Sequence, residues 1–371
     1  MKASFRSEIT VAQVFEAYYD CRRRKRNTAA AQTFEIDLEA NLMQLYEELQ
    51  SGAWSPSPAS VFAIKYPKPR EVWAAQFRDR IVHHLLYAEI GPIFERAFIH
   101  DSCASIKGRG TLYAADRLND HLRSATENWT RKTFYLKADI RSFFGSIRQD
   151  ALFTILARRV RDNTMLDLCR KLVFQDIRRD AVVQCSSRDL ALVPRHKSLF
   201  HAPAGVGLPI GNLSSQFFAN ALLDPLDQAI KRRLGMRHYV RYVDDMVIIH
   251  ESPAVLLDAA NAIRAHLAGI GMQLAESKTF VAPVDQGVDF VGHILRPHRR
   301  SGRAKTHRNA LRRVMAAPID EVAVCCNSYL GLYRHVGSLA QREAICRVGA
   351  MRGLRFDQAL TKVIWKEPIH G

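Results

Sequence analysis

Two adjacent carboxylates, Asp244 and Asp245, lie between apolar, partly β-branched flanks in the segment 241–249. Successive side chains of a strand point to opposite faces, so an acidic pair is unusual mid-strand and natural at a hairpin tip. Two acids at an apolar tip repel each other and need a counter-ion, for which a divalent metal with oxygen ligands is the usual choice. The pair alone favours a solvated turn, but its flanks and a second acidic segment upstream favour a metal site instead.

The second acidic segment is 134–139, which reads as a strand that ends in one carboxylate, Asp139. An aromatic pair follows, and then a helix is expected to open near Ser146. Asp139 precedes Asp244 by 105 residues. If the two strands end side by side in one sheet, their carboxylates can share two magnesium ions roughly 4 Å apart, which clamp the attacking and leaving oxygens of phosphoryl transfer. The pattern therefore predicts a two-metal site.

Two segments before these acids carry cations or glycines in expected turns. The segment 61–64 reads as a strand and runs into 65–72, where two prolines and interleaved cations indicate an extended hairpin tip. The segment 105–111 holds two glycines before a helix expected from Thr111, so backbone amides and the helix N-terminus can approach a phosphate. The alternative for the first segment is an ordinary exposed turn, and the second is a weak motif when taken alone.

Together these segments resemble the reverse transcriptases, because several separate motifs occur in the order typical of that family across residues 61–295. The resemblance implies an α+β fold of the right-hand polymerase type, with fingers, a palm built on an antiparallel sheet and a helical thumb. It also implies an RNA-directed DNA polymerase, a nucleotidyltransferase. The expected domains are an N-terminal helical extension over 1–60, fingers over 61–134, a palm over 135–295 with an insertion at 176–204, and a basic helical thumb over 296–371.

The resemblance assigns the catalytic and metal-binding residues. Asp139 and Asp244 would ligate two Mg²⁺ ions, with Mn²⁺ as a substitute, and Asp245 would support them. Lys278 matches a family lysine that can protonate the departing pyrophosphate, although a surface lysine is the alternative. The expected metal set is Asp139, Ile140, Asp244 and Asp245.

The resemblance also assigns contacts to the incoming nucleotide. Lys68, Arg70 and Arg109 would hold the phosphates by charge-assisted hydrogen bonds. Phe144 matches a bulky aromatic under the sugar, which would collide with a 2′-hydroxyl and so favour dNTPs; the alternative is that Phe143 and Phe144 are both core. The remaining expected nucleotide contacts are Ile210, Gly211 and Gln216.

Contacts to template and primer are expected further along the chain. The segment 287–295 looks like the primer-grip hairpin of the family, with Phe290 packed inward and Gly292 allowing a close approach of the primer backbone. Tyr242, Arg299 and Arg300 complete this expected set. The partners implied are an RNA template, a DNA or RNA primer and their duplex, and a small basic accessory protein or self-association remains open.

The glycine-rich segment 205–216 discriminates between subtypes. Group II intron and retron enzymes carry Gln before its glycine and Pro after its serine, whereas this chain has Ile210 before Gly211 and Gln216 after Ser215. Those differences resemble the error-prone enzymes of diversity-generating retroelements. The first alternative is a phage-defence (antiviral) reverse transcriptase that copies a dedicated non-coding RNA. A remote alternative is a catalytically inactive RNA-binding scaffold.

Composition agrees with a nucleic-acid partner. The 371 residues are 47% hydrophobic, and 54 Lys and Arg against 37 acids give a net charge of +17, which suggests a polyanionic ligand. The basic residues cluster at 22–26, and 290–319 holds eight of them with no acid. Seven cysteines without a metal-ligand spacing, no apolar signal core and no membrane-length apolar run lead us to expect a cytoplasmic protein. The family resemblance implies that it is bacterial or phage-encoded.

Apolar periodicity predicts the remaining elements. In the C-terminal tail, one apolar helical stripe is expected through Val322, Cys325, Tyr329 and Leu332. The insertion 176–204 is expected to be a surface loop or a short hairpin. Helices are expected over 8–50, 77–94, 149–175, 213–231 and 253–270, and a strand and turn over 271–279.

Overall fold

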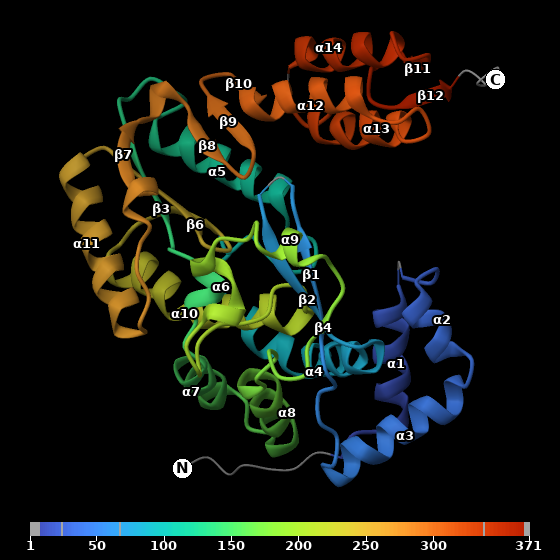
Figure 1. The fold of residues 1–371 in the computed structure, drawn as a ribbon. Helices are drawn as coiled ribbons and strands as arrows, with labels where there is room; N and C mark the ends of the chain where they lie inside the picture. Colours follow the sequence, from blue (N-terminus) through green and yellow to red (C-terminus); the bar gives the residue numbers. More distant parts are fainter. Residues whose placement is uncertain (1–7, 24, 67, 337, 367–371) are drawn as a thin grey trace. The chain divides into compact units, whose positions relative to one another are not determined.

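The structure is a computed structural model that describes residues 8–23, 25–66, 68–336 and 338–366 (Figure 1). The chain divides into two compact units, and each unit draws on three separate segments. The first unit comprises 1–107, 139–235 and 261–276, and the second comprises 108–138, 236–260 and 277–371. The expected division into consecutive fingers, palm and thumb segments stays a prediction.

The first unit begins with three helices, as expected for 8–50: α1 (Val11–Arg22), α2 (Ala29–Glu35) and α3 (Leu38–Ser51). A capping box of Thr10 and Gln13 starts α1, where it satisfies backbone N–H groups that have no partner within the helix. Within the basic block, Arg22 forms a 2.6 Å ion pair with Glu35, so part of this block stabilises the helices. Arg24 lies outside the described residues.

The expected hairpin is present as β1 (Ser60–Ile64) and β2 (Arg70–Ala74), which pair antiparallel; Pro67 at its tip lies outside the described residues. The surface loop or short hairpin expected for 176–204 is correct only in part: much of the segment is exposed and irregular, but β4 (Val182–Val183) pairs parallel with β1. The rest of this insertion holds α9 (Ser187–Leu190) and two 3₁₀ turns, Arg195–Lys197 and Leu199–His201.

Contacts with β2 explain why the insertion is not a loose loop. The backbone N–H of Leu199 donates to the buried Glu71 carboxylate at 2.9 Å. The Phe200 ring lies 4.8 Å from that of Trp73, which is fully buried. Such pairings join positions more than 120 residues apart, so local periodicity cannot reveal them.

Two long helices form the centre of the first unit: α4 (Phe77–Glu95) and α10 (Leu213–Gln228), the second continued by a π-helical turn over Ala229–Arg233. Both agree with the sequence expectation. They pack against each other through largely apolar faces that include the buried residues Phe94 and Phe217.

The single helix expected over 149–175 is wrong. The chain forms α7 (Gln149–Arg159) and α8 (Asn163–Phe174), and Asp162 caps α8 by accepting from the Thr164 N–H at 2.8 Å. A helix does open near Ser146, as expected, because α7 begins at Gln149, shortly after the four-residue α6 (Phe143–Ser146). The apolar spacing over 149–175 looks continuous in the sequence, but Asp162 can cap a helix and so begins a new one.

The second unit is built on a four-stranded sheet with the order β5-β6-β3-β7. Its strands are β5 (His238–Tyr242), β6 (Asp245–His250), β3 (Phe134–Asp139) and β7 (Phe280–Pro283). Helix α5 (Thr111–Ala125) begins where expected and packs on β5 and β6.

Two segments lie between β6 and β7 in the sequence. Helix α11 (Pro253–Gly269) agrees with expectation. The strand expected within 271–279 is wrong, because a 3₁₀ turn occupies Glu276–Lys278 and β7 starts only at Phe280.

The C-terminal part of the second unit holds the expected hairpin as β8 (Val288–Phe290) and β9 (His293–Arg296), extended by β10 (Arg299–Gly302). Three helices follow, α12 (Ala304–Ala316), α13 (Val322–Tyr333) and α14 (Leu339–Ala350), and Figure 1 shows them side by side. The chain then forms the hairpin β11 (Leu354–Phe356) and β12 (Val363–Lys366).

The apolar stripe expected on α13 is wrong except for Val322: each later buried residue lies one position further along the chain than predicted. The fully buried face is Val322, Cys326, Leu330 and Tyr333, whereas Cys325, Tyr329 and Leu332 are only partly buried. Both sets have helical spacing, so the packing of α12 and α14 decides which one faces the core. No helix in the described part of the chain combines the length and apolarity that crossing a bilayer requires.

Candidate active site

The acidic pair lies at the end of a hairpin, as its flanks predict. Strand β5 ends at Tyr242, β6 begins at Asp245, and these two residues face each other across the ladder. Val243 and Asp244 therefore form a two-residue tip. The flanking strand residues Val240 and Val247 are fully buried, so the tip extends from a packed core.

The backbone at this tip is strained. Val243 has φ of +56°, a region that β-branched residues rarely occupy. The tight turns of two-residue hairpins require positive φ, which glycine or asparagine normally supplies. Such outliers persist where surrounding structure enforces them, and they concentrate at functional sites.

A buried arginine holds the strained tip. Arg241 is only 1% exposed, and its Nη1 donates to the carbonyl oxygen of Val243 at 2.9 Å. The side chain thus folds back beneath the tip of its own hairpin. Because a guanidinium always carries its charge, this arginine also places a fixed cation close to the acidic pair.

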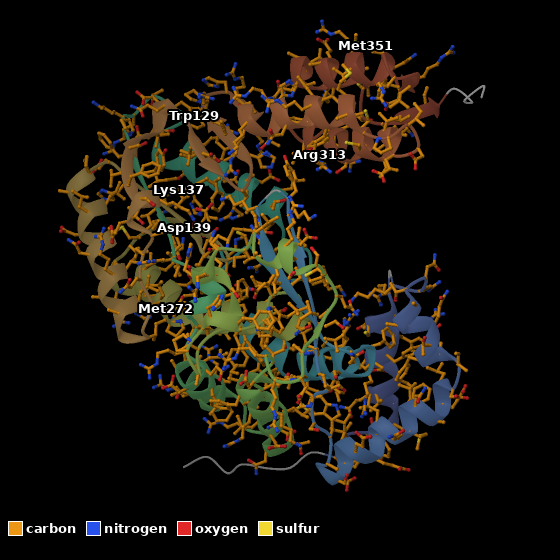
Figure 2. The ribbon with its side chains drawn as sticks, viewed as in Figure 1. Trp129, Lys137, Asp139, Met272, Arg313 and Met351 are labelled. Atoms are coloured by element: carbon orange, nitrogen blue, oxygen red, sulfur yellow. The ribbon has the colours of Figure 1, made fainter. Side chains whose placement is uncertain are left out.

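A second cation approaches Asp245 from the neighbouring strand. Lys137 of β3 lies with its Nζ 3.4 Å from Oδ2 of Asp245, and it also donates to the backbone carbonyl of Asp289. Asp289 in turn pairs with Arg303 at 2.6 Å. Figure 2 labels Lys137 and Asp139 along the same strand; two positions apart, they share one face of it.

The third acid, Asp139, is the last residue of β3, and β3 is the direct neighbour of β6 in the sheet. Oxygen donors of this kind suit magnesium, so the chemistry of the donor set fits the expected ions. Among the described residues, no three His, Cys, Asp or Glu side chains are grouped so as to hold a metal. Ile140 is buried and bridges to Leu274. The complete metal set stays a prediction.

The glycine-rich segment of the first unit is packed against β2. The N–H of Trp73 donates to the Ile210 carbonyl at 2.7 Å. Gly211 has φ of +131°, and a Cβ there would lie 2.7 Å from the Trp73 carbonyl oxygen. Only glycine fits this close approach. The structure therefore fixes the backbone of Ile210 and Gly211 on the strand that starts at Arg70.

Buried polar contacts join the start of α10 to its neighbours. The Asn212 side chain accepts from the Ala75 N–H at 3.1 Å, and Ser214 Oγ lies 2.6 Å from Nδ1 of His83. Burial lowers the pKa of His83 to about 3, so this ring is neutral at physiological pH. These contacts anchor the start of α10, the helix that also carries the exposed Gln216.

The other expected nucleotide contacts are distributed over both units. Within the first unit, Gln216 accepts from Ser105 at 3.2 Å, and the exposed Lys68 and Arg70 lie at the hairpin between β1 and β2. Phe144 is partly exposed while Phe143 is 3% exposed, so Phe143 belongs to the core.

Two further cations expected at the nucleotide belong to the second unit. Arg109 lies over the ring of Tyr113, 5.6 Å from its centroid. Lys278 is exposed in the 3₁₀ turn before β7. Their roles toward a nucleotide stay predictions.

The expected primer-grip residues lie on the β8-β9-β10 meander or beside the acids. Phe290 is fully buried, as predicted, and Gly292 at the β8–β9 turn has φ of +91° with open space around it. Arg300 pairs with Asp116 at 2.6 Å, and Arg299 is exposed. Tyr242 precedes the tip.

Lys137, Arg241 and Trp129 were not singled out from the sequence. Lys137 lies two positions before Asp139, and Arg241 three before Asp244, so a signal was present: a basic residue inside a strand that is otherwise buried. Buried charges are rare unless paired, and each cation therefore implied an acid or a carbonyl nearby. Trp129 carried no comparable signal.

Comparison with solved structures identifies the fold class. The apo telomerase of Candida tropicalis superposes with a TM-score of 0.50 at 12% identity, covering 80% of this chain and 58% of that one. A Candida albicans telomerase in complex with an RNA fragment superposes with a TM-score of 0.46 at 12% identity, covering 79% of this chain and 55% of that one. The chain thus spans less than two thirds of these telomerases. The fold is that of a right-hand polymerase.

Sequence comparison gives the family. Residues 66–295 match the family described as reverse transcriptase (RNA-dependent DNA polymerase), and this chain belongs to that family of nucleotidyltransferases. Protein YkfC of Escherichia coli (strain K12) is 25% identical over 301 residues, 71% of this chain and 74% of that protein. An uncharacterized 91 kDa protein in a cob intron of Schizosaccharomyces pombe is 25% identical over 154 residues, 42% of this chain and 16% of that protein.

Proposed function

We propose that this protein extends a primer 3′-hydroxyl with deoxynucleotides on an RNA template, and that Asp139, Asp244 and Asp245 are its catalytic acids. One observation carries the proposal: the strand that ends at Asp139 is the sheet neighbour of the strand that begins at Asp245. Family membership over residues 66–295 supports the same reaction.

The three carboxylates would hold the divalent ions, with the backbone of Ile140 beside them. Two such ions supply charge stabilisation for the attacking and leaving oxygens when bound. Arg241 orients the tip through the Val243 carbonyl, which keeps the Asp244 carboxylate in one position. Lys137 restrains the carboxylate of Asp245 from β3.

Further residues would handle the nucleotide. Lys68, Arg70 and Arg109 provide cations for the triphosphate, and Lys278 provides a proton for the departing pyrophosphate. The partly exposed ring of Phe144 would exclude a 2′-hydroxyl. Phe290, Gly292, Arg299 and Arg300 would bind primer and template.

Primer extension on a primed RNA, with and without Mg²⁺, tests the reaction. Asp139→Asn and Asp244→Asn should each abolish synthesis, because each removes a charged metal ligand while keeping the shape of the side chain. Asp258→Asn is the matched control, since Asp258 is exposed on α11. Undiminished synthesis by either site variant would refute the assignment, and no synthesis by the wild-type protein would favour an inactive RNA-binding scaffold.

The finer proposal is an error-prone enzyme of the diversity-generating retroelement type. Its support is Ile210, an apolar side chain whose backbone is fixed to β2 next to Gly211. An apolar group offers a base no hydrogen bond, so discrimination there depends on shape alone. Ile210→Gln should lower misincorporation opposite template adenines. Unchanged fidelity, or a single non-coding RNA co-purifying with the protein, would favour the phage-defence alternative.

A further inference from the structure

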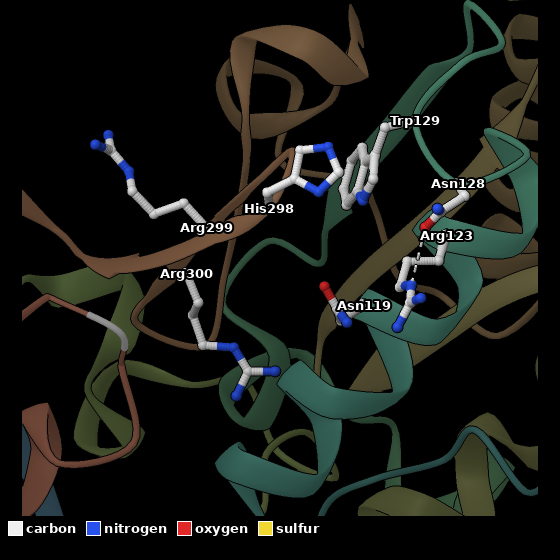
Figure 3. Close-up of a pocket in the computed structure, with 7 residues that line it drawn as sticks. All are labelled: Asn119, Arg123, Asn128, Trp129, His298, Arg299 and Arg300. Atoms are coloured by element: carbon white, nitrogen blue, oxygen red, sulfur yellow. Dashed lines mark hydrogen bonds between the residues drawn. The ribbon is translucent and has the colours of Figure 1, made fainter.

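The second unit contains a hollow of about 450 Å³ (Figure 3). Volumes in this range are typical of sites for small organic groups. None of the seven residues that line it carries a carboxylate, three are arginines, and two have aromatic rings. They are Asn119, Arg123, Asn128, Trp129, His298, Arg299 and Arg300.

One wall is a turn that presents a tryptophan in an unusual conformation. Glu127, Asn128 and Trp129 all have positive φ, at +49°, +60° and +75°. Left-handed backbone is unfavourable for residues with a Cβ, and more so for three in a row. The buried Thr126 holds this turn, because its Oγ1 accepts from the Trp129 N–H at 2.8 Å and donates to the Leu122 carbonyl at 2.7 Å.

The other wall is the turn between β9 and β10. Arg296 and Arg299 pair across it, so Pro297 and His298 form a two-residue tip, and His298 has φ of +55°. Figure 3 shows the imidazole of His298 next to the indole of Trp129, with Asn119 below them. Two strained turns from distant parts of the sequence thus bring two rings to one hollow.

The arginines of the hollow differ in how they are held. Arg300 is tied to Asp116 at 2.6 Å, which partly neutralises it. Arg123 donates from Nε to the Asn128 side chain at 3.3 Å, the dashed line in Figure 3. That bond uses one of five guanidinium donors, so the rest of the group can serve an anion. Arg299 is exposed at the rim.

We propose that this hollow binds an unpaired nucleotide of an RNA strand. The base stacks on Trp129 beside His298, and its phosphate pairs with Arg123 and Arg299. Stacking on aromatic rings combined with arginine contacts to phosphate is how proteins hold single strands, whereas paired bases present no free face to stack. The side-chain amides of Asn119 and Asn128 can reach the edge of a base. In taking the strand as RNA, the inference rests on the proposed function.

Tryptophan fluorescence of the full chain tests the proposal. Trp54 and Trp73 are 1% and 0% exposed, so Trp129 is the accessible reporter among these three. Titration with a short single-stranded oligoadenylate, without Mg²⁺ or dNTPs, should quench the emission. The same strand in a duplex, and free adenosine monophosphate, should quench at least tenfold less effectively, because one lacks a free base and the other lacks neighbouring nucleotides.

Variants separate the site from general charge. Trp129→Phe should remove the quench while anisotropy of labelled RNA still reports binding. Trp129→Gly, which suits the left-handed backbone and should keep the fold, should weaken binding roughly tenfold. Arg123→Ala should weaken binding severalfold more than Arg179→Ala, its matched control, which removes the same charge from a site 84% exposed in the first unit.

Three results would overturn the proposal: a wild-type quench that persists in Trp129→Phe, equal losses for Arg123→Ala and Arg179→Ala, or duplex RNA or free nucleotide quenching as well as the single strand. The titration requires no DNA synthesis. A protein that shows the expected quench but extends no primer would refute the proposed function and leave this site standing.

Discussion

The guanidinium of Arg241 donates to the carbonyl oxygen of Val243 at 2.9 Å, so a buried arginine supports a turn whose central valine has φ of +56°. The two residues lie in one hairpin, and the carboxylates of Asp244 and Asp245 follow directly. The contact offsets strain and limits the positions open to the acids. It therefore connects the buried sheet to the chemistry proposed at its edge.

Replacing Arg241 with methionine should lower both stability and synthesis. Methionine fills similar volume but leaves the Val243 carbonyl without this donor, which should cost about 1–3 kcal/mol of unfolding free energy. Primer extension should fall by at least about tenfold, since the tip can then relax. Arg241→Lys should not restore it, because a lysine cannot reproduce the planar fork. Chemical denaturation and single-turnover extension measure the two effects.

The exposed Arg232, in the π-helical turn that precedes the same hairpin in the sequence, provides the control. Arg232→Met should leave both quantities nearly unchanged. Equal effects of the two substitutions would mean that stability and synthesis depend on the positive charge rather than on the contact with Val243.

Removing the cation of Lys137 should change the metal requirement. The Nζ of Lys137 lies 3.4 Å from Asp245, and a bound cation must compete with it for that carboxylate. Lys137→Met should therefore lower the Mg²⁺ concentration for half-maximal extension severalfold, because the local potential becomes more negative. The exposed Lys362 gives the control Lys362→Met, for which no shift is expected. A raised Mg²⁺ requirement in Lys137→Met would contradict this account.

Gly211 should tolerate no side chain. An added Cβ would lie 2.7 Å from the Trp73 carbonyl and 2.9 Å from Val72, at a φ of +131°. Gly211→Ala should destabilise the protein by about 1–3 kcal/mol, and more if the turn cannot move. Gly269→Ala is the matched control, since nothing lies within 4 Å of the added Cβ at the end of α11. Thermal unfolding should separate the two variants clearly.

His83 should make stability fall in acid. Its pKa is about 3 in the folded protein and about 6.5 when unfolded, so between these values the unfolded chain binds the extra proton. Its contribution is complete above pH 6.5 and is lost as pH falls toward 3, by up to about 1.4 kcal/mol per pH unit. His83→Asn should flatten the dependence in this window, while His201→Asn, at an exposed position, should not. Equal pH slopes for wild type and His83→Asn would exclude this role.

Elements with strong local signals were predicted correctly. The hairpin around Asp244 follows from acids between β-branched flanks, and the helices α4, α10 and α11 follow from long apolar periods. Errors arose where a helix cap or a long-range strand pairing decides. The helix break at Asp162 depends on a cap, and the strand β4 depends on pairing with β1, more than 110 residues earlier.

The residue types in the expected active site could be predicted from the sequence, but the order of its strands could not. Residue type made Asp139, Asp244 and Asp245 candidates, because carboxylates in apolar strands are costly without a partner. Their strand order, and the approach of Lys137 to Asp245, depend on which strands pair in the sheet. Pairing is set by side-chain packing across the sheet, which no single segment encodes.

By itself, the sequence determined the family, the acidic strand ends and the net positive charge, because these depend on residue types and their short spacing. The tertiary structure alone decided that Arg241 holds Val243 and that Trp129 shares a hollow with His298. The hollow joins turns about 170 residues apart, and only the packing of the second unit brings them together. Short-range preferences act over a few residues, whereas a binding surface is defined by side chains that the folded core brings together.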